Sequence, residues 1–140
     1  MSVWTHVACV IRADWVKVED SKHDVWDEVT GRAIYNCDWL TDDDYERARM
    51  RRDWADYDRN PEQFMPTGSE GSLQRAVWVN PVCGSAAWYT VTVFGDLRDY
   101  DDHKAIRKWF TDTCSKLVVR QAVCTCEAGG ETHTWTWGDE

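Results

Sequence analysis

Four segments of the chain alternate hydrophobic and polar residues with a period of two, which indicates β-strands. The first strand is predicted over residues 3–11, where Val7, Cys9 and Ile11 share one side and Trp4 and His6 take the other. The remaining three are predicted over residues 72–79, 86–94 and 117–126. The turn residues Gly129 and Gly130 then predict a short fifth strand over residues 131–137.

The alternation also predicts which side chains face the interior. The predicted inward positions are Val7, Val77, Val91, Val119 and Val123. The predicted outward positions are Trp4, His6, Trp78, Trp88, Phe94, Arg120, Ala122 and Cys124.

Helical spacing predicts two or three helices between the strands. One begins at Asp101 or Asp102 and runs to about Ser115, with apolar residues at Ile106, Trp109, Phe110 and Cys114. A second begins at Thr41 and continues through the Arg-rich stretch at 47–52. A third spans residues 23–30 and ends at Gly31, which suits a helix C-terminus.

The order strand, helix, strand, strand, helix, strand is typical of an α+β domain. We expect a ferredoxin-like sandwich: an antiparallel sheet of four to five strands with the helices on one face. The whole chain, residues 1–140, is expected to form one domain. A helical, acidic and Arg-rich insertion is expected at about residues 36–60.

Tryptophan is the residue that changes this picture most, because the chain has ten in 140 residues. That density exceeds what one small core can bury, so some rings should form a contact surface. The partner-binding residues predicted on the sheet are Trp4, His6, Trp78, Trp88 and Arg120. An aromatic sheet face also suggests self-association, so a homodimer is a further expectation.

Charge narrows the class of partner. The formal net charge is −9, which argues against direct binding to nucleic acid, including RNA binding by the sheet. The acidic cluster Asp42, Asp43 and Asp44 is expected to meet a basic partner surface, or to mimic phosphate in a nucleic-acid-binding groove.

No basic segment followed by an apolar run opens the chain, so we expect a cytoplasmic protein and no membrane contact. The six cysteines are then expected to be reduced thiols. The lone CxC pair, Cys124 and Cys126, does not match a zinc-site pattern. The sequence therefore predicts no cofactor.

The segment Gly68-Ser69-Glu70-Gly71 has two interpretations. It contains no Lys and precedes a strand, so it predicts a turn that orients that strand rather than a phosphate loop. In the alternative, Gly68, Ser69, Gly71 and Arg98 bind an anionic small molecule. That site would suit a protein that sequesters a nucleotide signal.

Catalytic chemistry has weaker support in the sequence. Asp96, Asp99 and His103 are compatible with a metal-dependent enzyme, but a capped helix start explains the same residues. His6 is the best single candidate for acid–base catalysis, yet it has no recognisable nucleophile or supporting carboxylate. We therefore predict no catalytic residues and no metal site.

Four stretches resemble a family of small bacteriophage and prophage accessory proteins. They are residues 3–7 (VWTHV), 68–73 (GSEGSL), 94–100 (FGDLRDY) and 119–122 (VRQA). The resemblance implies a phage setting, in which small proteins block host defence. The expected function is a non-enzymatic inhibitor of a host antiviral defence factor, such as a CRISPR effector, acting by protein–protein contact. A nucleotide-signal binder and a metal-dependent enzyme are the alternatives.

Overall fold

The computed structural model describes residues 2–16, 25–34, 42–81 and 87–138. They form an α+β fold with a five-stranded antiparallel sheet and three α-helices. The strands are β1 (Trp4–Val16), β2 (Gln74–Pro81), β3 (Ala87–Arg98), β4 (Leu117–Ala128) and β5 (Glu131–Thr136). The helices are α1 (Val25–Thr30), α2 (Asp44–Arg59) and α3 (His103–Ser115), with a short 3₁₀ turn, η2 (Pro61–Gln63).

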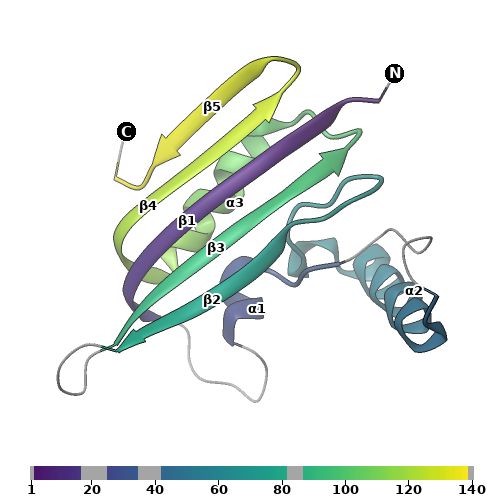
Figure 1. Ribbon diagram of the computed structural model, residues 1–140, viewed down its shortest axis with the longest axis horizontal. Helices are drawn as coiled ribbons and strands as arrows, with labels where there is room; N and C mark the ends of the chain where they lie inside the picture. Colours follow the sequence, from purple (N-terminus) through teal and green to yellow (C-terminus); the bar gives the residue numbers. More distant parts are fainter. Residues whose placement is uncertain (1, 17–24, 35–41, 82–86, 139–140) are drawn as a thin grey trace.

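The strand order in the sheet is β2-β3-β1-β4-β5, and every neighbouring pair is antiparallel. β1 is therefore the central strand, although it comes first in the sequence (Figure 1). All five predicted strands are present. β1 and β3 extend several residues beyond the predicted ends, and β5 follows the predicted turn at Gly129 and Gly130.

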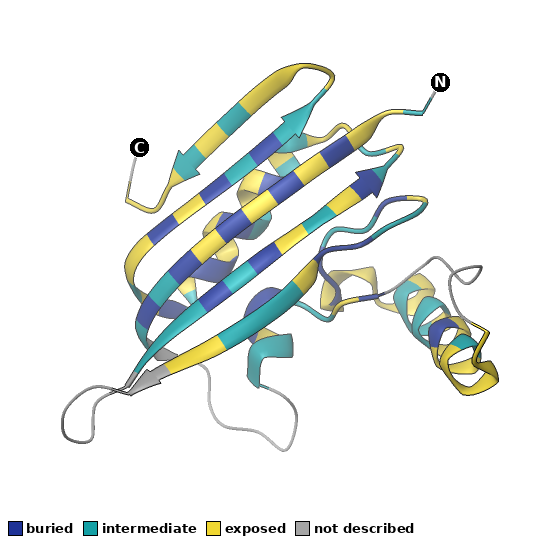
Figure 2. Cartoon of the chain, viewed as in Figure 1, coloured by how far each residue is buried: buried dark blue, intermediate teal, exposed yellow. Residues whose placement is uncertain are grey.

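Alternation along the strands creates the hydrophobic core on one side of the sheet. In β1, Val7, Cys9 and Ile11 are at most 3% exposed, while the residues between them face away (Figure 2). Val91 and Val93 of β3 extend the same buried layer. The predicted inward and outward sides of β1 and β3 are thus confirmed, and we call the side away from the core the outer face.

Helices α1 and α3 lie behind the sheet in Figure 1 and pack against each other. Asp102 caps α3, since its side chain accepts a hydrogen bond from the Ala105 N–H (3.1 Å). Ile106, Phe110 and Cys114 of α3 are buried, as their helical spacing predicts. The indole N–H of Trp109 then donates to the Thr30 carbonyl oxygen (2.6 Å), which joins α3 to α1.

Helix α2 lies to one side of the sheet instead of behind it (Figure 1). Its N-cap is Asp43, whose carboxylate accepts from the N–H groups of Tyr45 and Glu46. The predicted start, Thr41, lies outside the described residues. Only Met50 of α2 is buried, which agrees with the irregular apolar pattern of this segment.

The prediction for one half of β4 is wrong. Val123 is 37% exposed and lies on the outer face, while Ala122 and Cys124 are buried. The cause is a β-bulge: Arg12 pairs with Gln121, but the next residue, Ala13, pairs with Val119. The extra residue reverses the sides of all later positions in β4. Val119, before the bulge, is partly buried as predicted.

Buried thiols make the free energy of unfolding depend on pH in the alkaline range. Burial raises the pKa of the Cys114 thiol from 9.0 to about 12 and that of Cys126 to about 11. The pKa of Cys9 is also raised, by its hydrogen bond with Cys124 and by burial. Of the six cysteines, these four are described, and all are free and buried.

We therefore expect the free energy of unfolding to fall as pH rises above about 9, towards 12. The folded state holds these protons more tightly than the unfolded chain, so their stabilisation is complete below pH 9 and is lost above it. Urea unfolding from pH 7 to 11 measures the effect. Cys114→Ala should make the decline shallower, and an unchanged slope would contradict this assignment.

Candidate binding face of the sheet

The outer face gathers side chains from four strands through their register. Opposite β1, Ala8 pairs with Phe94 and Val10 with Thr92, and Trp78 of β2 pairs with Thr90 of β3. Directly paired residues in an antiparallel sheet point to the same side. The apolar members of this face are Trp4, Ala8, Val10, Ala76, Trp78, Trp88, Phe94 and Val123.

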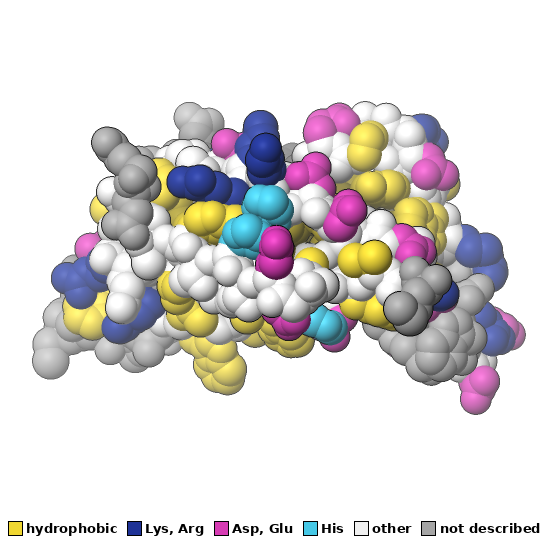
Figure 3. All heavy atoms as spheres, turned by 90° about the horizontal axis from the view of Figure 1, so that it is seen from above, with side chains coloured by type: hydrophobic (Ala, Val, Ile, Leu, Met, Phe, Trp, Pro, Cys, Tyr) yellow, Lys and Arg dark blue, Asp and Glu magenta, His cyan; other side chains and the backbone are white. Residues whose placement is uncertain are grey.

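Large apolar side chains on this face are exposed. Trp78 is 65% exposed, Phe94 53% and Trp4 38%. The outward prediction for these residues is confirmed. Figure 3 shows hydrophobic side chains projecting from its lower margin, the side of the sheet that faces the reader in Figure 1. Several large apolar side chains exposed on one face of a sheet are typical of a contact surface.

Two arginines flank Trp88 at one end of the outer face. The guanidinium carbon of Arg120 lies 4.1 Å from the Trp88 ring centroid, and that of Arg12 lies 5.7 Å away. Arg120 Nε also pairs with Asp14 Oδ1 at 2.8 Å. Arg120 faces outward as its alternation with Val119 predicts, and it lies at the bulge in β4. Its contact with Trp88 is a cation–π interaction.

His6 and Asp96 form the polar end of the outer face. His6 Nδ1 lies 2.6 Å from Asp96 Oδ1, and the two residues are directly opposite in the β1–β3 ladder. Both side chains are more than half exposed. Exposed pairs of this kind contribute at most about 1 kcal/mol to stability, so the contact mainly orients the two side chains.

The Gly68–Gly71 segment is a turn packed against the end of β3. The Gly68 N–H donates to the Gly71 carbonyl, and the Ser69 N–H donates to the Arg98 carbonyl. The Arg98 side chain contacts Glu70 (2.6 Å) and Ser2 (2.9 Å). These amides and this arginine are engaged within the protein, which supports the turn interpretation. Anion binding by these four residues stays a prediction without a supporting contact.

Residues of the metal-dependent alternative make separate contacts. Asp96 binds His6, Asp99 accepts a hydrogen bond from the Ser69 hydroxyl (2.7 Å), and His103 stacks on His133. Among residues 2–16, 25–34, 42–81 and 87–138, no group of three or more His, Cys, Asp or Glu side chains is placed to hold a metal ion.

A stack of rings beneath β5 was not predicted. The rings of His103 and His133 are parallel, with centroids 3.9 Å apart, and Trp135 continues the stack at 6.1 Å. Histidine side chains gather near the centre of Figure 3, beside a carboxylate. A shallow hollow of about 270 Å³ lies there, lined in part by Asp101 and Glu131. The sequence signal was partial: alternation placed His133 and Trp135 on one side of β5, but nothing indicated His103 as their neighbour.

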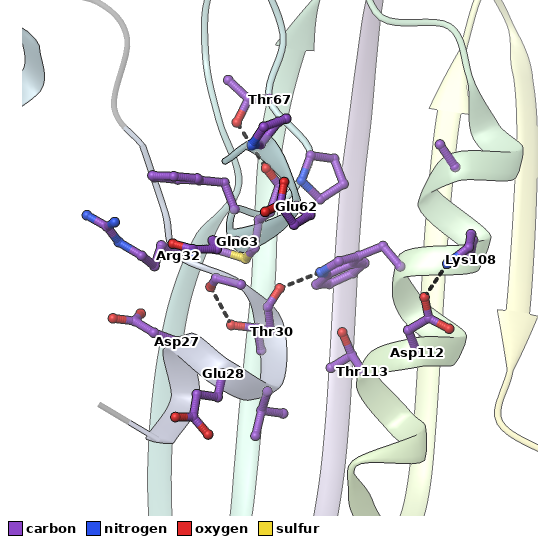
Figure 4. Close-up of a pocket in the computed structure, with 18 of the residues that line it drawn as sticks. Asp27, Glu28, Thr30, Arg32, Glu62, Gln63, Thr67, Lys108, Asp112 and Thr113 are labelled. Atoms are coloured by element: carbon purple, nitrogen blue, oxygen red, sulfur yellow. Dashed lines mark hydrogen bonds and ion pairs between the residues drawn. The ribbon is translucent and has the colours of Figure 1, made fainter. Parts of the chain in front are cut away.

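A groove with a volume of about 930 Å³ lies between α1, α3 and the segment around η2 (Figure 4). Its charged side chains are mostly paired with other parts of the protein. Lys108 binds Asp112 (2.6 Å), Asp27 binds Arg75 (3.0 Å) and Arg32 binds Asp53 (3.3 Å). No convergent polar set therefore identifies a ligand among the described residues of this groove.

The acidic cluster is not part of the outer face. Asp42, Asp43 and Asp44 lie at the N-terminal end of α2, to one side of the sheet (Figure 1). Asp43 caps the helix, and Asp44 pairs with Arg47 (2.6 Å). The structure thus places Trp4, His6, Trp78, Trp88 and Arg120 on one face, with Trp4 and His6 at the opposite end from Trp88 and Arg120, and it places the three aspartates on a separate surface.

Comparison with protein-family models, curated proteins and solved structures finds no match to this chain. None of the described helices has the length and apolar character needed to cross a membrane. Function must therefore be argued from the site itself.

Gly71→Ala should destabilise the protein by about 2–5 kcal/mol, because it strains the backbone and overpacks the turn. Gly71 has a φ of +78°, and an added methyl group would lie 2.0 Å from the Asp96 carbonyl oxygen. Gly130→Ala is the matched control: its φ is +84°, but nothing lies within 4 Å of the new carbon. The control should cost only about 1–2 kcal/mol. Equal losses in urea unfolding would show that the turn does not pack as described.

Proposed function

We propose that this protein is a non-enzymatic binding protein whose outer sheet face docks onto another protein. The observation that carries the proposal is the exposure of Trp4, Trp78 and Phe94 on the same sheet face as the Arg-flanked Trp88. Trp and Arg are the residue types most enriched among those that dominate binding energy at interfaces.

The dimensions of the face support this use. Five strands spaced about 4.8 Å apart give a width of roughly 20 Å, and strands of six to thirteen residues at about 3.3 Å per residue give lengths of roughly 20–45 Å. The resulting area, on the order of 700 Å², is close to the roughly 800 Å² that one partner contributes to a standard interface. One partner can therefore cover these exposed aromatic residues completely.

Most of the net charge lies on surfaces other than the outer face. On the outer face, Arg12 and Arg120 offset the carboxylates of Asp14 and Asp96, so the exposed aromatic residues are surrounded by little net charge. The net charge of −9 belongs mostly to other surfaces, including the N-terminal end of α2. We propose a partner with an apolar docking site bordered by a basic surface, towards which the acidic cluster steers the protein.

The biological setting proposed is a phage accessory protein in the cytoplasm of an infected bacterium. The host partner is an antiviral defence factor, inhibited by contact in the manner of an anti-CRISPR protein. Support for this setting is the resemblance of the four sequence stretches to phage proteins. An acidic surface also suits a partner whose basic groove normally binds nucleic acid.

The finer fold assignment, a ferredoxin-like sandwich, is likewise a proposal. The order β2-β3-β1-β4, with α3 joining β3 to β4, supports it. In that assignment β5 is an added strand at the β4 edge. α1 and α2 fill the connection between β1 and β2.

The double substitution Trp4→Ala/Trp78→Ala should abolish capture of the partner from infected-host lysate, with affinity reduced more than about tenfold. Both side chains are exposed, so the free energy of unfolding should change by less than about 1 kcal/mol. Affinity capture with quantitative mass spectrometry measures the loss. Tyr45→Ala is the control, because Tyr45 is 74% exposed but lies on α2. A partner retained by the double variant and lost by the control would overturn the proposal.

Asp42→Asn/Asp44→Asn should slow association with the captured partner and weaken its dependence on salt, with little change in dissociation. Asp43 is left intact because it caps α2. The control is Asp101→Asn/Asp112→Asn, which removes two negative charges near α3. Each variant breaks one exposed ion pair, Asp44–Arg47 in the test variant and Lys108–Asp112 in the control. Surface plasmon resonance at two salt concentrations compares the pairs. Identical association rates for both variants would remove the steering role of the acidic cluster.

A further inference from the structure

Two buried thiols face each other across the central strand and its neighbour. Cys9 of β1 and Cys124 of β4 are direct partners in the antiparallel ladder, and Figure 1 shows these two strands side by side. Both side chains belong to the buried layer on the core side of the sheet, where they are at most 2% exposed. The two thiols are free and are hydrogen-bonded to each other.

The backbone hydrogen bonds of the neighbouring ladders show what kind of pair this is. The Asp99 N–H donates to the Val3 carbonyl, so alternate residues of β1 from Val3 to Cys9 bond towards β3. The Trp137 N–H donates to the Ala122 carbonyl, so alternate residues of β4 from Ala122 onward, including both cysteines of that strand, bond towards β5. The two facing cysteines are therefore a non-hydrogen-bonded pair of the β1–β4 ladder, the type whose side chains lie closest together.

A non-hydrogen-bonded pair has the spacing that a disulfide needs. Its Cα atoms are about 4.5 Å apart, and those of disulfide-bonded cysteines are about 4.4–6.8 Å apart. The Cβ atoms of direct partners must approach by about 1 Å to reach the usual disulfide spacing of about 3.8 Å. The pair lies near the short end of the Cα range, which favours a bond that reducing agents can open again.

The other cysteines fit a bond to this pair less well. Cys126 lies two residues further along β4, so it is a diagonal neighbour of Cys9 at about 7–8 Å, which is too far for a disulfide. Cys114 reaches the core from α3, where no ladder fixes its distance to a strand cysteine. Cys37 and Cys83 lie outside the described residues. The sheet register thus singles out one pair.

We infer that Cys9 and Cys124 are a site of reversible two-electron oxidation, at which an intramolecular disulfide joins β1 to β4. The oxidant is a small disulfide such as oxidised glutathione. One protein thiolate attacks this disulfide and expels a glutathione thiolate, and the second protein thiolate then attacks the mixed disulfide and expels the other. The two protons lost by the protein thiols are taken up by the two glutathione thiolates. The protein loses two electrons, and the oxidant gains them.

Burial makes this a slow reaction in the folded protein. The pKa of Cys9 is raised by its hydrogen bond with Cys124 and by burial, so little of its reactive thiolate is present at neutral pH. Oxidation therefore requires an opening of the β1–β4 ladder that brings a thiol to the oxidant. In a reducing compartment the pair remains as two thiols, and a rise in the proportion of oxidised glutathione converts it.

The bond changes the stability of the fold and not the residues of the outer face. It cross-links residues 9 and 124 and so restricts the unfolded chain, which makes the oxidised protein harder to unfold. Both cysteines lie on the core side of the sheet, so the exposed tryptophans of the outer face stay where they are. The inference is therefore independent of the proposed host partner.

Treatment with oxidised glutathione, in urea just below the unfolding midpoint and followed by removal of the urea, tests the inference. Peptide mapping under non-reducing conditions should find Cys9 linked to Cys124, in a chain two hydrogen atoms lighter than before. Dithiothreitol should restore both thiols. The oxidised protein should unfold at a higher urea concentration than the reduced protein. Its stability should also decline less steeply above about pH 9, because the Cys9 thiol no longer ionises on unfolding.

Cys9→Ala and Cys124→Ala should each abolish the bond and the rise in the urea midpoint. Cys126→Ala is the matched control and should keep both, because Cys126 is as deeply buried on the same side of β4 but pairs with Val7. Circular dichroism checks that each variant is folded, and the peptide map of the wild type decides the matter where a variant is not. A wild type in which the two cysteines stay unlinked, or in which either is linked mainly to another cysteine, would overturn the inference. A linkage found only in protein that has lost its native circular dichroism would do the same, since the bond would then belong to a misfolded chain.

Discussion

The structure depends on β1 being hydrogen-bonded along both edges while one of its faces is sealed by the core. Thr5, Val7, Cys9, Ile11 and Ala13 are all at most 3% exposed. A shift of one residue in either ladder would turn these side chains into solvent and carry Trp4 and Val10 inward. The cost of burying or exposing so many groups fixes the register. The same constraint that builds the core therefore also assigns every side chain of the outer face.

Gly95 of β3 and Gly68 of the turn before β2 allow the two backbones to lie very close together, and this close contact fixes where the edge strand β2 begins. An added methyl group on Gly95 would lie 2.5 Å from the Ser72 carbonyl oxygen, and one on Gly68 would lie 2.5 Å from the Arg98 nitrogen. The backbone can pass this closely only because side chains are absent. The close approach starts β2 at a defined position, and that position places Trp78 opposite Thr90. The turn therefore determines the position of a binding-face residue, although the turn itself makes no contact with a partner.

Much of this arrangement could be predicted from the sequence because a sheet with one buried face imposes strict alternation. The sides of β1 and β3 follow from that alternation, the turn before β5 follows from Gly129 and Gly130, and the buried stripe of α3 follows from helical spacing. The bulge in β4 was not predicted, and it reverses the sides of the residues that follow it. Arg12 was missed for a different reason. β1 was predicted to end at residue 11, so its next outward position was not considered.

The number of tryptophans was a less specific signal than their positions. Trp26, Trp109 and Trp135 pack against the core, and only part of the set contributes to an exposed surface. Composition alone predicts an excess of rings without saying which ones face outward.

The acidic residues show why charge and contact need to be considered separately. Asp43 is explained by helix capping and Asp44 by its pair with Arg47, so neither residue requires a partner to account for its presence. Their field still acts over roughly one Debye length, about 8 Å at physiological salt, and it adds to the net charge of the whole chain. The outer face carries a weaker field because Arg12 and Arg120 offset Asp14 and Asp96 there. Affinity must then come from desolvation of the exposed aromatic residues, while the acidic surface can change only the rate and orientation of approach.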